Sequence, residues 1–324
     1  MTLPNFFVIG AGKSGTTSLW RYLEQHPEVY MSPIKEPNFF TYEGGVPDFR
    51  GPRTPWAVTD LEAYRALFAG VSEEKAIGEA SAYYLYSEEA PKRIRHHVPD
   101  AKLVAVLRNP VDRAYSHFLY RLAQGGEGLT DFAQALDAEE ERVRERWGPS
   151  FHYKRRGFYH EQLSRYYDLF GPDQIRVYLY EDLKEDPVGM TQSIFRFLRV
   201  DDAFVPDTSR RHNVARIPRS RALQAFIEKP NPFKSVLRPF LPKGLRKRIA
   251  LNLRNRNLAK PAPMPEGVRE VLTEAYREDI LKLQKLVGRD LSGWLSKEAW
   301  ARDEAQLPPH RRPGTSATTC PRRS

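Results

Sequence analysis

Short runs of apolar residues alternate along the chain with longer stretches in which apolar residues recur every three or four positions. The short runs lie at 6–9, 75–78, 103–107 and 174–183. Each is typical of a β-strand, whereas the three-to-four spacing between them indicates amphipathic helices. Strands that alternate with helices favour a mainly parallel sheet. We therefore predict an α/β fold of three layers, with a central, mainly parallel sheet flanked by helices.

The predicted helices cover most of the chain between these strands. They span 16–26, 60–69, 87–97, 110–124, 130–145, 158–170, 190–200 and 266–287. Asn109 is a suitable cap for the fourth helix, and Pro110 suits its first turn. The helix at 130–145 is highly charged and is expected to be exposed, while the last one forms a helical C-terminal extension. Residues 27–58 are rich in Pro, Gly and aromatic residues, which predicts long irregular loops.

Composition indicates a soluble globular protein. Of the 324 residues, 40% are hydrophobic and 28% are charged. No apolar run reaches eighteen residues, which predicts no membrane span, and the N-terminus lacks the features of a secretory signal. The only cysteine, Cys320, cannot form an intramolecular disulfide, so we expect a reducing compartment and a cytoplasmic, bacterial location. The eight histidines show no metal-ligand spacing, and no metal is expected.

The net charge of +10 is concentrated in two places. Residues 232–260 hold nine Lys or Arg, residues 308–324 hold four Arg, and neither stretch contains an acid. Without these thirteen charges the remainder of the chain is near −3. Since the basicity is local, nucleic acid is not an expected partner. We predict one domain over 1–307, with a basic, partly helical insertion at about 232–260, and a disordered tail over 308–324.

The insertion at 232–260 also carries interleaved aliphatic residues, which leaves three interpretations. It could lie on an anionic membrane surface, so that the protein is peripheral to the inner membrane. It could collect an acidic acceptor. It could also be a solvated basic helix packed on the domain, which is the slightly favoured interpretation.

The first strand leads into a loop with the features of an anion cradle. The stretch GAGKSGTTSL (Gly10–Leu19) joins glycines, a lysine and hydroxyl residues to the start of a helix. Small residues let backbone N–H groups converge on an oxyanion, and a helix N-terminus favours phosphate. The loop of ATP- and GTP-hydrolysing proteins needs a glycine six residues before the lysine, but that position is Phe7. The alternative is a glycine turn with a threonine cap.

A second anion signal follows the strand at 103–107. Arg108 stands at the carboxyl end of that strand, where open α/β sheets bind ligands, and Ser116 follows in the next helix. A guanidinium and a hydroxyl are both suited to phosphate. Taken with the first loop, the motif could hold the second phosphate of one nucleotide. The alternative is a surface ion pair between Arg108 and Asp112, or involving Arg113, with Ser116 merely packed.

These two motifs together resemble those of sulfotransferases that use 3′-phosphoadenosine 5′-phosphosulfate (PAPS), especially the carbohydrate-type bacterial members. The family's loop for the 5′-phosphosulfate reads roughly G-x-x-K-[ST]-G-T-[ST]-x-L, and its motif for the 3′-phosphate reads roughly R-[ND]-P-x-x-R-x-x-S. The resemblance extends over about residues 5–298. It implies a P-loop-like fold, PAPS as the sulfate donor and no metal requirement.

The resemblance also implies roles for individual residues. Lys13 would stabilise the charge on the leaving group, and Glu36, in KEPNFF, would be the general base for the acceptor. Glu79 is a lesser candidate for the base. The alternative for Glu36 is a solvated charge pair with Lys35 in a turn. The donor would be bound by Gly12, Lys13, Ser14, Gly15, Thr16, Thr17, Ser18, Arg108 and Ser116.

Two further segments are implied less specifically. A basic loop that closes over the nucleotide corresponds to 210–221, where Arg211, Asn213, Arg216 and Arg219 are candidates, or simply a solvated basic loop. The segment KRRG, residues 154–157, could approach the nucleotide or the acceptor.

The predicted reaction is transfer of a sulfuryl group from PAPS to a hydroxyl or amine of a carbohydrate or glycoconjugate, including a glycolipid. The alternative acceptor is a small secondary metabolite, a lipid or an acyl-chain hydroxyl. A P-loop kinase is disfavoured by the position of the glycine and by the lack of a magnesium-binding aspartate. A binding protein that keeps a degenerate nucleotide fold is the alternative outside enzymes.

Overall fold

The computed structural model describes residues 2–50, 57–209, 217–218, 258–259 and 262–297. Within these residues five strands form one sheet in the order β2-β3-β1-β4-β5, and every pairing in it is parallel. The strands are β1 (Phe6–Gly10), β2 (Val29–Met31), β3 (Ala76–Ala80), β4 (Lys102–Leu107) and β5 (Ile175–Leu179). The predicted α/β fold with a central parallel sheet is therefore confirmed.

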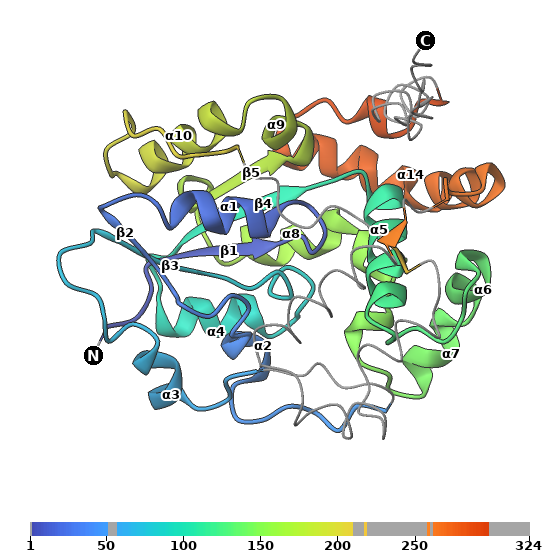
Figure 1. The fold of residues 1–324 in the computed structure, drawn as a ribbon, viewed down its shortest axis with the longest axis horizontal. Coiled ribbons are helices and arrows are strands. Elements are labelled where there is room, and N and C mark those ends of the chain that lie inside the picture. Colours follow the sequence, from blue (N-terminus) through green and yellow to red (C-terminus); the bar gives the residue numbers. More distant parts are fainter. Residues whose placement is uncertain (1, 51–56, 210–216, 219–257, 260–261, 298–324) are drawn as a thin grey trace, which may run out of the picture.

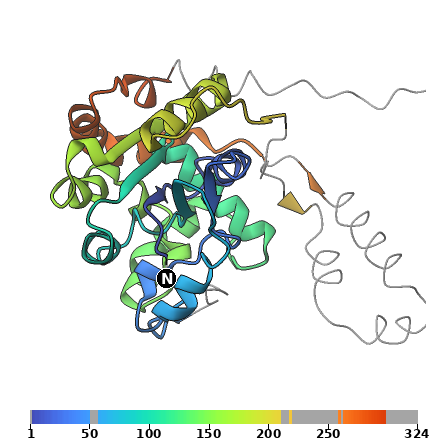
Figure 2. The ribbon, with the colours of Figure 1, turned by 90° about the vertical axis from the view of Figure 1, so that its left-hand side faces the viewer.

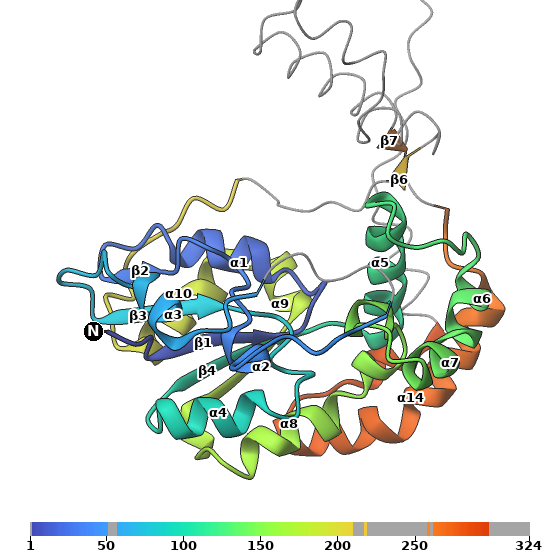
Figure 3. The ribbon, with the colours of Figure 1, turned by 90° about the horizontal axis from the view of Figure 1, so that it is seen from below.

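Helices pack on both faces of this sheet (Figure 1). Their bounds are α1 (Thr16–Leu23), α2 (Phe39–Tyr42), α3 (Leu61–Ala66), α4 (Ala90–His97), α5 (Pro110–Ala123), α6 (Phe132–Asp137), α7 (Glu139–Arg144), α8 (Tyr159–Tyr167), α9 (Tyr180–Glu185), α10 (Pro187–Leu198) and α14 (Glu266–Val287). Seen from below, α1, α9 and α10 lie on one side of the strands, and α4, α8 and α14 lie on the other (Figure 3). Figure 2 views the sheet roughly along its strands, with the dark-blue α1 to its right and the orange α14 to its left.

The alternation of side chains along each strand produces these layers. Successive residues of a strand point to opposite faces of the sheet. Phe7 and Ile9 accordingly pack in the core beneath α4, α8 and α14, while Phe6 and Val8 pack in the core against α1 and α10. Both faces are apolar, as expected for a parallel sheet covered on both sides.

The carboxyl ends of the strands meet at one edge of the sheet and carry the loops that follow β1, β3 and β4. Because β1 lies between β3 and β4 in the sheet, the loop after β1 has the other two loops on either side. The strands point towards α5 in Figure 1. Asn109 caps this helix as predicted, since its side chain accepts hydrogen bonds from the N–H groups of Val111 and Asp112.

Several elements differ by a few residues from the sequence-based bounds, and three segments differ in kind. The region 27–58 contains β2 and the short α2, because its apolar residues are buried against the sheet. The stretch 130–145 is two helices, α6 and α7, and it is partly buried through Phe132, Ala135, Glu139 and Arg142. The strand predicted at 174–183 ends at Leu179, where α9 begins, and the side chain of Asp182 accepts a hydrogen bond from the Leu179 N–H.

Several predictions fall outside the described residues. They concern Arg211, Asn213, Arg216 and Arg219, most of the basic insertion at 232–260, and the tail at 308–324. Ile217–Pro218 (β6) pairs antiparallel with Leu258–Ala259 (β7). Among the described residues, no helix has both the length and the apolar content needed to cross a bilayer.

Candidate active site

The loop after β1 depends on glycine where it enters α1. Gly15 has a φ of 85°, and a Cβ at this position would lie 2.4 Å from Cδ2 of Leu183. Only glycine satisfies both the backbone conformation and the close approach. The first turn of α1 has no side-chain cap. Ser14 is fully buried, and its hydroxyl has no hydrogen-bond partner among the described residues. The loop thus has a buried hydroxyl and a helix N-terminus without a side-chain cap, which are groups that an anionic ligand could bind.

Lys13 and Arg108 lie next to each other at this loop. Nη1 of Arg108 donates a hydrogen bond to the backbone carbonyl of Lys13 at 3.3 Å. The Lys13 ammonium lies 4.0 Å from the ring centroid of Tyr120, and the Arg108 guanidinium lies 4.8 Å from that of Tyr180. Burial, followed by the charge of Arg108, lowers the pKa of Lys13 to about 8. The two predicted anion sites are therefore adjacent, and one ligand could reach both.

Ser116 lies on the same face of α5 as Tyr120. It lies in α5, is half-buried, and precedes Tyr120 by one helical turn. Residues four apart share a helix face, so Ser116 is on the face that meets Lys13 through Tyr120. The alternative of an ion pair between Arg108 and Asp112 does not occur, because Asp112 pairs with Arg269 at 2.8 Å.

Glu36 lies beyond the end of β3, on the other side of the loop. Its backbone N–H donates to the Ala80 carbonyl at 2.9 Å, and its φ is 63°. Oε1 accepts a hydrogen bond from Nζ of Lys35 at 2.5 Å. The predicted pair thus forms, but the Lys35 side chain is only 16% exposed, so the pair is not simply solvated. The charge of Glu36 acts on Lys13 and raises its pKa against the larger effect of burial.

Glu79 is fully buried beneath Glu36 and is surrounded by hydroxyl groups. Its carboxylate accepts hydrogen bonds from Tyr64 at 2.8 Å, Ser81 at 2.7 Å and Tyr84 at 2.5 Å. Burial raises the pKa of Glu79 to about 7, although the three hydroxyl donors oppose this shift. With these donors around it, Glu79 faces protein groups and is poorly placed to take a proton from an acceptor.

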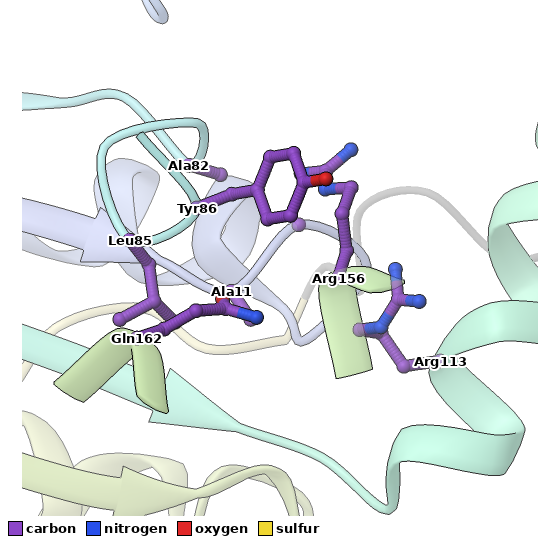
Figure 4. Close-up of a pocket in the computed structure, with 8 residues that line it drawn as sticks. Ala11, Ala82, Leu85, Tyr86, Arg113, Arg156 and Gln162 are labelled. Atoms are coloured by element: carbon purple, nitrogen blue, oxygen red, sulfur yellow. The ribbon is translucent and has the colours of Figure 1, made fainter. Parts of the chain in front are cut away.

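The segment 154–157 reaches the loop through Arg156 (Figure 4). The Arg156 guanidinium packs over Tyr83, 4.3 Å from its ring centroid, and a Cβ on Gly12 would lie 2.8 Å from its Nη2. Arg156 is 5% exposed, and Arg113 of α5, 1% exposed, lines the same small pocket. Nη2 of Arg113 donates to the Tyr153 carbonyl.

His117 responds to the positive charge gathered here. It is buried in α5, and its pKa is lowered well below the usual value, first by burial and then by Arg156, Arg113, Lys13 and Arg121. The imidazole is therefore neutral at physiological pH. The cations that lower this pKa include Lys13, Arg113 and Arg156, which lie around the loop.

Sequence reasoning did not identify the aromatic residues that hold the two cations. Tyr120 and Tyr180 have the spacing of ordinary helix residues, and only their proximity to Lys13 and Arg108 distinguishes them. Arg113 is part of the Arg108–Ser116 motif, and its position in that motif was the sequence feature that could have indicated its place at the site. Among the described residues no group of three or more His, Cys, Asp or Glu side chains is arranged to hold a metal ion.

Comparison with known proteins assigns the chain to a protein family. Residues 3–213, more than half of the chain, match the family model described as "Sulfotransferase domain". The chain therefore belongs to the sulfotransferase domain family. A crystal structure of a sulfotransferase from Alicyclobacillus acidocaldarius is 34% identical, covers 91% of this chain and all of that chain, and superposes with a TM-score of 0.70.

Curated relatives include larger proteins. The chain is 28% identical over 307 residues to the bifunctional heparan sulfate N-deacetylase/N-sulfotransferase 4 of Mus musculus, covering 91% of this chain and 31% of that protein. It is 32% identical over 168 residues to mouse carbohydrate sulfotransferase 15, covering 41% of this chain and 30% of that protein. The chain thus spans about a third of the length of these relatives.

The requirement for glycine at position 15 can be tested against a second glycine with a similar backbone. Gly125 has a φ of 68°, and a Cβ there would meet no atom within 4 Å. We expect Gly125→Ala to lower the free energy of unfolding by about 1–2 kcal/mol through backbone strain alone. Gly15→Ala adds the collision with Leu183, and its loss should be larger by a further ~1–3 kcal/mol in urea unfolding. Equal losses for the two variants would show that Leu183 moves aside freely.

Proposed function

We propose that this chain is a PAPS-dependent sulfotransferase that sulfates a hydroxyl or amine of a carbohydrate or glycoconjugate. The observation that supports this most directly is the contact of Lys13 and Arg108, with Glu36 on the opposite side of the same loop. Two cations and one carboxylate meet where β1, β3 and β4 end. This arrangement suits an anionic donor on one side and an acceptor that loses a proton on the other.

The described residues fit such a donor. The loop at 12–18 offers backbone N–H groups, the hydroxyls of Thr16 and Thr17, and the buried hydroxyl of Ser14, which bonds to none of the described residues. We assign this loop to the 5′-phosphosulfate. Arg108 and Ser116 are assigned to the 3′-phosphate, for which a guanidinium and a hydroxyl are suitable donors. No aspartate is needed, because the cations of the chain itself neutralise the phosphates.

Glu36 and Lys13 carry the chemistry in this proposal. As the acceptor oxygen or nitrogen forms its bond to sulfur, Glu36 takes the proton that the acceptor loses. The bond between sulfur and the bridging phosphate oxygen breaks, and the Lys13 ammonium stabilises the negative charge that develops on that oxygen. Adenosine 3′,5′-bisphosphate and a sulfated acceptor are the products, so atoms and charge balance without another reactant.

A carbohydrate acceptor is supported by the names of relatives. Both the heparan sulfate enzyme and carbohydrate sulfotransferase 15 are named for sugars. The acceptor side of the site, beyond β3, holds Glu36, Lys35 and the ring of Tyr83 beneath Arg156. Polar groups beside an aromatic face suit a sugar ring, which has polar edges and an apolar face.

Binding of the nucleotide product tests the donor assignment. Adenosine 3′,5′-bisphosphate without magnesium should raise the melting temperature, by an amount that corresponds to about 2.7 kcal/mol at 100 times its Kd. ATP with magnesium should have little effect. Arg108→Gln should weaken this stabilisation, whereas Arg196→Gln should not, since Arg196 is an exposed residue of α10 paired with Asp202. Preferential stabilisation by ATP with magnesium would indicate a kinase instead.

Replacement of the proposed base tests the acceptor assignment. We expect Glu36→Gln to lower kcat by about 10²–10⁴-fold, since the amide cannot take a proton. The melting shift caused by adenosine 3′,5′-bisphosphate should be retained. Glu24→Gln is the control, because Glu24 also pairs with a neighbouring cation, Arg21, but lies at the other end of α1. Turnover is followed with radiolabelled donor and oligosaccharides prepared from heparan sulfate. Full activity of Glu36→Gln would remove Glu36 from the mechanism.

The lowered pKa of Lys13 predicts a pH dependence of nucleotide binding. Lys13 is charged below about pH 8 in the free protein and loses its proton above this value. A bound phosphate favours the charged form, so binding above pH 8 must take up a proton. The affinity for adenosine 3′,5′-bisphosphate should therefore fall from pH 8 to 10, by up to about tenfold per pH unit. The affinity of Lys13→Arg, measured by titration calorimetry, should not change between pH 8 and 10. An affinity of the unmodified protein that is equally independent of pH would contradict the assignment.

A further inference from the structure

The segment that carries Glu36 has an unfavourable backbone. Glu36 and Asn38 have φ values of 63° and 55°, in the left-handed region that non-glycine residues rarely adopt. The conformation is unfavourable for Glu36 in particular, since Asn adopts this region more readily than other residues with a Cβ. Strain of this kind persists only where the surroundings determine the conformation. Contacts elsewhere must therefore hold the segment 36–40 in place.

The Glu36 N–H is bonded to the Ala80 carbonyl, Arg93 binds the Phe40 carbonyl, and two hydroxyl groups hold the backbone between these points. The Ser81 hydroxyl accepts a hydrogen bond from the Asn38 N–H at 3.0 Å, and the Tyr84 hydroxyl accepts one from the Phe40 N–H at 3.3 Å. Nδ2 of Asn38 in turn donates to the carbonyl of Glu36 at 2.8 Å. The backbone of Glu36 is thus connected to residues of the segment after β3.

Glu79 receives the hydroxyl protons of both Ser81 and Tyr84, at 2.7 Å and 2.5 Å. The ionised carboxylate favours this arrangement because it only accepts hydrogen bonds. Their lone pairs are then free to accept from the N–H groups of Asn38 and Phe40. Tyr64 differs, because its hydroxyl bonds to Glu79 at 2.8 Å and reaches no backbone N–H of the segment.

We propose that Glu79 is a positioning residue that acts through Ser81 and Tyr84 to hold Glu36 in the geometry in which it takes a proton from the acceptor. The proposal rests on the proposed function for the role of Glu36. Among charged groups, Glu36 lies close enough to Glu79 to raise its pKa, while Arg93 and His97 of α4 contact the same segment through the carbonyl and the ring of Phe40. The other groups that face Glu79 are the hydroxyls of Tyr64 from α3, Ser81 and Tyr84.

Matched hydroxyl deletions test this role. Ser81→Ala and Tyr84→Phe each remove one hydroxyl bond to Glu79 together with one bridge to the 36–40 backbone. Tyr64→Phe removes one hydroxyl bond to Glu79, keeps the stacked ring against Phe39 and leaves both bridges. All three variants should lose similar stability in urea. Only Ser81→Ala and Tyr84→Phe should lower kcat, by about tenfold to a hundredfold, because a small displacement of a reacting group is costly.

The catalytic effect should depend on Glu36. In a Glu36→Gln background the further change Ser81→Ala should alter the residual turnover by less than about twofold, since the two residues act as one unit. The KM for PAPS and the melting shift with adenosine 3′,5′-bisphosphate should be unchanged in all hydroxyl variants. Equal kcat in Ser81→Ala and Tyr64→Phe, or a full additional loss in the Glu36→Gln background, would overturn the proposal.

An exchange measurement separates this inference from the proposed function. Hydrogen–deuterium exchange of peptides that contain residues 36–40 should be faster in Ser81→Ala and Tyr84→Phe than in Tyr64→Phe. If the unmodified protein binds no adenosine 3′,5′-bisphosphate and sulfates nothing, the proposed function fails. The exchange result then decides alone whether the hydroxyl bridges hold the segment, and unchanged exchange would reject them.

Discussion

Two adjacent cations, Lys13 after β1 and Arg108 after β4, constrain the rest of the site. Lys13 and Arg108 repel, and burial makes the Lys13 charge more costly still, which its lowered pKa records. The faces of Tyr120 and Tyr180 offset part of this cost, since an aromatic ring attracts a nearby cation. An anionic ligand would remove the remaining penalty. The fold thus stores unfavourable electrostatic energy where a phosphate-containing ligand is expected to bind, and binding is favoured accordingly.

The order of strands explains why the acidic side chains Glu36 and Glu79 lie close to the two cations. Because β1 is between β3 and β4, the glycine loop lies between Arg108 at the end of β4 and the carboxylates of Glu36 and Glu79 at the end of β3. Hydroxyl groups, instead of cations, surround the buried carboxylate of Glu79. A donor held over β1 and β4 and an acceptor held over β3 would therefore approach from opposite directions, which is what an in-line transfer requires.

The sequence predicted the parallel sheet and both anion motifs because these features are local. Apolar strands, glycines and a capped helix leave a pattern within a dozen residues, and Asn109 and Pro110 marked the start of α5 correctly. Features that depend on tertiary contact were missed. Nothing in the sequence distinguishes Tyr120 from a packing residue of α5, and the Pro-rich region 27–58 conceals β2, whose three residues become a strand only by pairing with β3. The split of 130–145 into α6 and α7 likewise reflects burial that a charge pattern does not reveal.

Two arginines that a sequence pattern would place at the surface, Arg113 and Arg156, are buried beside the loop. Arg113 and Arg156 are almost fully buried, and neither forms an ion pair with a carboxylate among the described residues. Burial first, and then the charges of Arg156 and Arg113, lower the pKa of His117, so the imidazole adds no further cation in the same volume. A neutral imidazole can pack at the centre of this cluster, whereas a charged one would add repulsion in a region of low dielectric constant. The guanidinium groups are permanently charged, and Lys13 is the cation at the loop whose charge responds to pH in the neutral to mildly alkaline range.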